Sequence, residues 1–180
     1  LFQPHVRPIV RGKVNAPVEF GAKIAISLCS GYARMEKLSW DNFNECTTLQ
    51  HAVETYYARH AYYPEAVLAD QIYRNRENLA FCKARGIRLS GPQLGRPKKE
   101  NKQDKIIARQ DAAERNAIEG KFGEGKRAYG LGRIRARLRE TSETVIALQL
   151  LIMNLERKLR LLFLSIFRWL LRRGLLPQLA

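Results

Sequence analysis

The sequence is poor in acidic residues. Its 180 residues include 17 Asp and Glu against 32 Lys and Arg, which gives a formal net charge of +15. A balance this basic indicates a polyanionic partner, and nucleic acid is the commonest one. Because 46% of the residues are hydrophobic, the chain is not a disordered basic tail. Its length suffices for one domain with its own core.

Cysteine and histidine are also scarce. Cys29, Cys46 and Cys82 lie far apart and form no C-x-x-C pair, and the three His residues are equally scattered. These spacings suggest neither a disulfide framework nor a structural zinc site. They favour a reduced, cytoplasmic environment.

Long hydrophobic runs are missing as well. The longest charge-free stretches near the C-terminus, 144–155 and 161–167, are shorter than the ~20 residues of a membrane-spanning helix. The N-terminus has no signal-peptide pattern. We therefore expect residues 145–180 to form a long amphipathic helix that packs on the domain, with no membrane contact. Binding to a membrane surface is the alternative.

Local patterns predict an α/β fold with a mixed sheet. Two strands, 19–28 and 31–40, should form a hairpin, because they flank a short turn at 29–31. Further along the chain, the pattern predicts helices over 47–60, 74–86 and 106–119 and from about 134, with short strands at 65–73 and 87–91. Residues 91–105 are rich in Gly, Pro and Lys, so we expect a basic insertion in an exposed loop.

Two acidic residues are candidates for chemistry. Asp70 ends the apolar run 66–69, which would place it at the rim of a sheet, where active sites gather. The alternative is that it caps the following helix. Glu119 lies in a basic stretch, and Arg115 and Lys126 fall within about 40° of it around a helix. Here the alternative is an ordinary Arg115–Glu119 surface pair.

Carboxylates and cations in this combination suit chemistry on a DNA backbone. Carboxylates can hold a pair of Mg²⁺ or Mn²⁺ ions, and cations beside them can hold the phosphates. Metal binding would explain why an acidic residue, Glu119, lies in a basic stretch.

Much of the chain resembles bacterial insertion-sequence transposases of the DDE type, in the branch related to the IS-four and IS-five groups. The resemblance runs from about residue 5 to 160 and includes the segments 6–28, 38–45, 62–97 and 115–159. Its most specific element is Arg, three residues, Glu, six residues, Lys, which Arg115, Glu119 and Lys126 match. Ala112 stands where the family signature has Tyr.

The resemblance implies a ribonuclease H-like catalytic domain over residues 1–144 that cleaves and joins DNA with Mg²⁺ or Mn²⁺. In this family Asp70 and Glu119 would be catalytic metal ligands. DNA-backbone contacts would come from Arg115, Lys126, Arg127 and Arg133. The partners would be double-stranded DNA, both transposon ends and target, and a second subunit in a homodimer. The protein would be associated with the bacterial nucleoid.

The family's first catalytic Asp has no counterpart in the expected place. It should precede the hairpin, but residues 1–18 contain neither Asp nor Glu, and the sequence starts at Leu1. We therefore expect a truncated transposase that lacks this Asp. The alternative function is a non-catalytic basic protein that binds nucleic acid.

Overall fold

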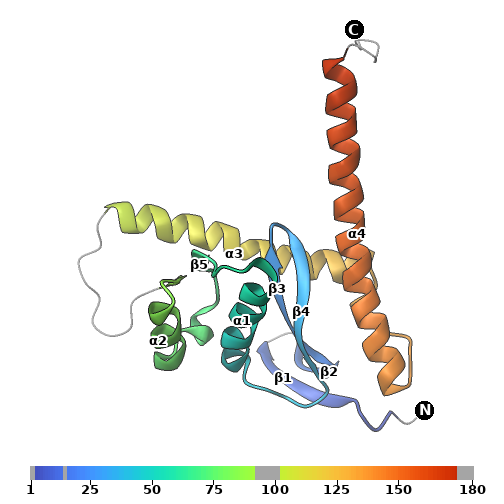
Figure 1. Cartoon of the computed structure of the whole chain (residues 1–180). Helices are drawn as coiled ribbons and strands as arrows, with labels where there is room; N and C mark the ends of the chain where they lie inside the picture. Colours follow the sequence, from blue (N-terminus) through green and yellow to red (C-terminus); the bar gives the residue numbers. More distant parts are fainter. Residues whose placement is uncertain (1–2, 14–15, 92–101, 174–180) are drawn as a thin grey trace.

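The computed structural model describes residues 3–13, 16–91 and 102–173 (Figure 1). The strands are β1 (Arg7–Lys13), β2 (Ala16–Gly21), β3 (Lys23–Cys29), β4 (Tyr32–Ser39), β5 (Ala66–Val67) and β6 (Arg88–Leu89). The helices are α1 (Thr48–His60), α2 (Arg76–Ala84), α3 (Lys102–Ala128) and α4 (Arg139–Arg172), with short 3₁₀ turns at Glu45–Thr47 and Gln71–Tyr73. None of the described helices is long and apolar enough to cross a membrane.

The N-terminal part consists of two antiparallel hairpins. The predicted hairpin is β3–β4, and its turn residues Ser30 and Gly31 have φ values of 51° and 79°, as tight hairpin turns require. The predicted strand 19–28 is wrong at its start. Residues 19–21 belong to β2, which pairs with β1. This strand ends at Gly21, where φ is 146°.

The middle of the chain forms a βαβ unit. Strands β5 and β6 pair in parallel through the crossover helix α2, and α1 packs on the same core. That core contains Leu49, Val53, Cys82, Ile87 and Leu89. Helix α2 ends as predicted, with Gly86 at φ 69° just beyond its last turn. The predicted strand 65–73 is shorter than expected, because only two of its residues pair.

Helix α3 runs without interruption through Gly120, Gly123 and Gly125, beyond the predicted end at 119. A Cβ on Gly125 would lie 2.5 Å from Leu131 and 3.3 Å from Met153. The absence of a side chain therefore lets the following loop and α4 approach closely, and this packing offsets the cost of about 1 kcal/mol for a helical glycine. The predicted basic insertion falls mostly on residues 92–101, which lie outside the described part.

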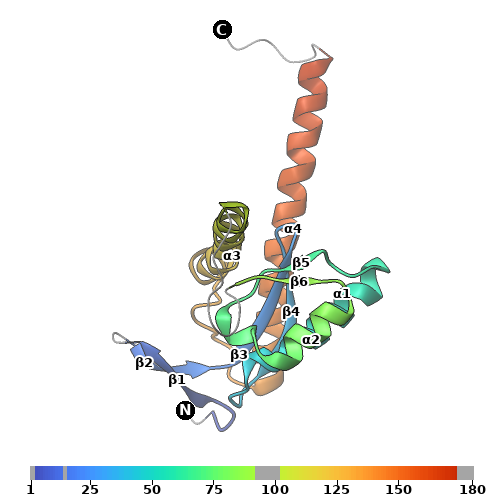
Figure 2. The ribbon, with the colours of Figure 1, turned by 90° about the vertical axis from the view of Figure 1, so that its left-hand side faces the viewer.

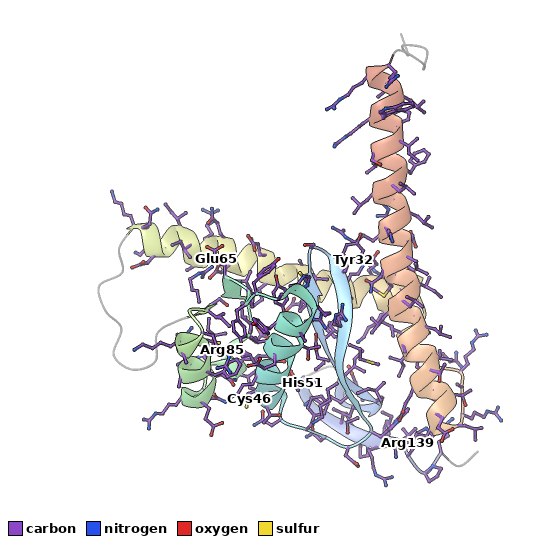
Figure 3. The ribbon with its side chains drawn as sticks, in the orientation of Figure 1. Tyr32, Cys46, His51, Glu65, Arg85 and Arg139 are labelled. Carbon is purple, nitrogen blue, oxygen red and sulfur yellow. The ribbon has the colours of Figure 1, made fainter. Side chains whose placement is uncertain are left out.

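Helix α4 binds the β3–β4 hairpin with its first half. Ala33 on β4 donates its N–H to Asn154 Oδ1 (2.8 Å) and accepts from Asn154 Nδ2 (2.6 Å). Ala33, Leu150 and Met153 form a second core beside these bonds. Figure 3 shows Arg139 at the start of this helix and Tyr32 near the hairpin tip. The second half of α4 projects away from the rest of the chain in both Figure 1 and Figure 2.

The mixed α/β composition and the long C-terminal helix confirm the coarse prediction. The strands of the described residues, however, form three separate two-stranded sheets, two antiparallel and one parallel. A single mixed sheet was expected.

Candidate functional site

Asp70 lies just beyond the carboxyl end of β5. The neighbouring backbone is fixed by polar contacts to the end of β6: Ala69 N–H donates to Ser90 Oγ (3.1 Å), and Arg74 Nη1 donates to the Ser90 carbonyl (2.8 Å). The two parallel strands therefore end together. This is the edge of a parallel sheet where ligand sites usually form.

The side chain of Asp70 does not cap the segment that follows. Asp70 occupies the N-cap position of the 3₁₀ turn, but only its backbone carbonyl bonds the turn, by accepting from Tyr73 N–H (3.0 Å). Its side chain makes no capping hydrogen bond and is 68% exposed. The carboxylate is therefore available to a ligand, in contrast to the capping alternative.

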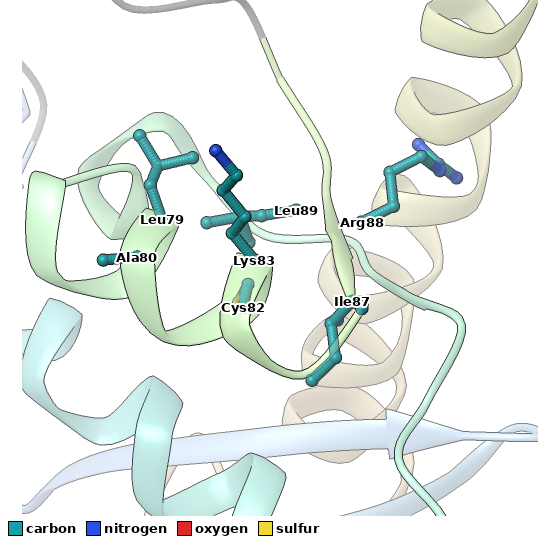
Figure 4. A pocket seen from close by; sticks show the side chains of 8 residues that line it. Leu79, Ala80, Cys82, Lys83, Ile87, Arg88 and Leu89 are labelled. Atoms are coloured by element: carbon teal, nitrogen blue, oxygen red, sulfur yellow. The ribbon is translucent and has the colours of Figure 1, made fainter.

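Helix α3 is held against these strand ends by two ion pairs one turn apart. Arg88 on β6 reaches Asp111 with two parallel hydrogen bonds, one of them 2.9 Å long. Arg115 Nε lies 3.5 Å from Asp70 Oδ1. Figure 4 shows Arg88 turned away from α2 and toward α3.

The two ion pairs differ in strength. The pair of Arg88 with Asp111 is bidentate, and Asp111 is only 13% exposed, so this pair is the stronger anchor. The hydrogen bonds that Arg88 donates to the Asp111 carboxylate raise the pKa of Arg88. The longer, more exposed pair of Arg115 with Asp70 contributes little to stability, so another cation can replace Arg115 beside Asp70 at small cost.

Glu119 is exposed one turn beyond Arg115. Because α3 is continuous, Arg115, Glu119 and Lys126 share one face of the helix, as the spacing predicts. Arg115 contacts Asp70, just beyond the end of β5. The surface-pair alternative would instead have Arg115 contact Glu119. The structure therefore brings the helix face that carries Glu119 to the strand end that carries Asp70.

The remaining predicted cations lie farther along the chain. Lys126 is exposed about 10 Å beyond Glu119 along the helix axis. Arg127, on another face, donates to the Gly123 carbonyl (3.3 Å). Arg133 lies in the loop after α3, at a cleft of about 460 Å³ between that loop and α4. The structure thus pairs Arg115 with Asp70 and places Glu119 one helical turn farther along α3, with Lys126 on the same face.

In the described part of the chain, no three His, Cys, Asp or Glu side chains gather closely enough to hold a metal ion. Asp70 and Glu119 are therefore at most two ligands of such a site. Their hard carboxylate oxygens suit Mg²⁺ or Mn²⁺. The two residues therefore have the right chemistry for such an ion, but they are too few to complete its binding site.

Asp111 and Arg88 are structural partners that the sequence prediction missed. Asp111 precedes Arg115 by four residues, so the same helical spacing that linked Arg115 to Glu119 also places Asp111 on this face. That spacing was the available signal.

A model of the family described as "Transposase DDE domain" matches residues 67–156. This span is half of the chain. The chain belongs to this family.

No curated protein and no solved structure gives a match. The span matched by the transposase family runs from β5 through the docked half of α4 and contains every predicted site residue. It ends at residue 156, where α4 begins to leave the domain. Family membership implies a DNA substrate and, in general, dependence on a divalent metal.

Proposed function

We propose that this chain is part of the catalytic domain of an insertion-sequence transposase of the IS-four and IS-five-like group, acting in metal-dependent cleavage and transfer of DNA strands. The observation that carries the proposal is the contact of Arg115 with Asp70. It brings a strand-end carboxylate and the Glu119 face of α3 together inside the matched span.

In this proposal Asp70 and Glu119 hold Mg²⁺ or Mn²⁺. When bound, such an ion activates an attacking oxygen or steadies a leaving one. Asp70 presents its carboxylate from a backbone fixed by Ser90 and Arg74, and Glu119 does so from a continuous helix. The third carboxylate would come from a segment upstream of Leu1, because residues 1–18 contain no acid.

The cations have a separate role in binding DNA phosphates. Arg115 would exchange its contact with Asp70 for a phosphate once a metal ion neutralises that carboxylate. Lys126 extends the same face. Arg127, on another face of α3, and Arg133, in the following loop, would add further phosphate contacts. Each contact would add a salt-dependent term to DNA affinity.

A ribonuclease H-like fold is part of the proposal. It is supported by the order of elements, with hairpins first, then a parallel βαβ unit and then the helix that bears Glu119. A homodimer in the longer protein and association with the bacterial nucleoid follow from the family resemblance and are proposed with it.

Metal-dependent nicking of supercoiled DNA tests the function. We expect a chain extended upstream to include the missing Asp to nick DNA in Mg²⁺ or Mn²⁺ and to be inactive in EDTA. The 180-residue chain should bind the same DNA and nick it far more slowly, because it supplies two of three ligands.

The competing function, a basic protein that only binds nucleic acid, makes the opposite prediction. Both chains would then bind DNA with an affinity that falls steeply with salt and is indifferent to Mg²⁺ and to Asp70→Ala. An inactive extended chain with such binding would overturn the proposed catalysis and leave this alternative in place.

A further inference from the structure

The projecting half of α4 exposes large apolar side chains on several sides, including the side turned away from the domain. Every residue from Lys158 to Trp169 is exposed. In the first half of α4, buried Ile146, Leu150 and Met153 mark the side that faces the domain. A helix that exposes this much apolar surface in water requires a partner.

More than half of the thirteen exposed large apolar residues of α4 follow a heptad pattern. Seven large side chains recur at alternating spacings of four and three residues over three heptads, and each is between 48% and 64% exposed. We call them the outer seam: Leu148, Ile152, Leu155, Leu159, Leu162, Ile166 and Trp169. The seam lies about 140–240° around the helix from Ile146, so the domain does not obstruct it.

We propose that the outer seam is a homodimer interface, in which α4 of a second copy of this chain packs alongside as a parallel two-stranded coiled coil. The order of residue types selects this partner. One set of seam positions is Ile152, Leu159 and Ile166, and the other is Leu148, Leu155, Leu162 and Trp169. β-branched residues at a with Leu at d favour two parallel strands.

The flanking positions are compatible with a parallel pair of identical helices. The residues that meet across the seam are Leu151 with Glu156, Lys158 with Phe163, and Ser165 with Leu170. None of these pairs brings like charges together, although the chain carries a net charge of +15. The basic side chains that remain lie mostly on the other faces of α4, and the stem of Lys158 can cover Phe163.

The area is also sufficient for a dimer. Seven half-exposed side chains on each helix, at roughly 80 Å² apiece, remove about 1,100 Å² from water. Leu151 and Phe163, which are 50% and 67% exposed, bring the total into the range of about 1,200–2,000 Å² for stable interfaces. The proposal does not depend on the metal chemistry of Asp70 and Glu119.

The test is the mass of the full chain in solution, by sedimentation equilibrium at about 1 to 50 µM. We expect twice the 20.7 kDa monomer mass for the wild type and the monomer mass for Leu159→Lys/Leu162→Lys. The matched control is Leu161→Lys/Leu164→Lys. Its residues are 46% and 44% exposed on other faces of the same part of α4, so it should remain dimeric.

Strand direction is tested by oxidation in a Cys29→Ser background, since Cys29 is exposed. A parallel seam predicts that Leu162→Cys forms a covalent dimer and Leu164→Cys does not. A monomeric wild type, or equal dissociation of the seam and control variants, would overturn the proposal. So would a monomer that binds anionic phosphatidylserine vesicles through the seam residues, which would identify a membrane-binding face instead.

Discussion

Glu119→Gln, introduced into a chain extended upstream to include the proposed third carboxylate, is expected to lower the rate of DNA nicking by at least about a thousandfold. Gln keeps the size and shape of Glu but is a weaker, uncharged metal ligand. A bound metal ion contributes several kcal/mol of transition-state stabilisation, and each 1.4 kcal/mol is a factor of ten in rate. Asp70→Asn should have the same effect.

DNA affinity should be unchanged or slightly higher in both variants, because each removes a negative charge from a basic surface. The matched control is Glu114→Gln. Glu114 is an exposed Glu on the same helix, about 100° around the axis from Arg115, and its variant should nick at the wild-type rate. Nicking by Glu119→Gln at the wild-type rate, or an equal loss in Glu114→Gln, would contradict the assignment.

A second large effect is expected for Asn78→Ala, which should lower the free energy of unfolding by about 2–4 kcal/mol. Asn78 is 1% exposed. Its Nδ2 donates to the carbonyls of Cys46 (2.9 Å) and Tyr73 (2.9 Å), and its Oδ1 accepts from Gln50 (3.3 Å). Removing the amide leaves two carbonyls without this donor and opens a cavity.

The Asn78 prediction concerns the site as well as stability. The bond to Tyr73 fixes the 3₁₀ turn whose first hydrogen bond is made by the Asp70 carbonyl, so the variant should also loosen the backbone that presents Asp70. Urea unfolding followed by circular dichroism measures the change. Asn116→Ala, at an exposed position in α3, is the control and should be neutral or slightly stabilising. Equal midpoints for the two variants would refute the role given to Asn78.

Local signals predicted the elements whose geometry is set within a few residues. The turn at Ser30 and Gly31 and the end of α2 at Gly86 depend on positive φ angles near the signal itself. The strand-end position of Asp70 was visible in the same way, as an apolar run that stops at an acid. The availability of its carboxylate was not, because Asp also caps turns and helices.

Tertiary contacts determine the features that the sequence did not predict, namely the continuity of α3 and the partner of Arg115. Three glycines argued against a continuous α3, but Gly125 packs on Leu131, beyond the end of the helix, and on Met153 in α4. The second of these contacts is far outside any local window. The sequence predicted the helix face on which Arg115 lies, but it did not predict that Asp70 is the partner of Arg115. That it contacts Asp70 depends on how α3 lies across β5 and β6, which the bidentate pair of Arg88 with Asp111 fixes.

The joint binding of one metal by Asp70 and Glu119 is tested most directly by iron-mediated cleavage of the polypeptide. The 180-residue chain, loaded with Fe²⁺ and treated with ascorbate and peroxide, should be cut near both residues, as mapped by mass spectrometry. Excess Mg²⁺ should suppress both cuts, and either Asp70→Asn or Glu119→Gln should abolish both, since the two carboxylates share the ion. Cuts elsewhere, or cuts near one residue that survive substitution of the other, would contradict a shared site.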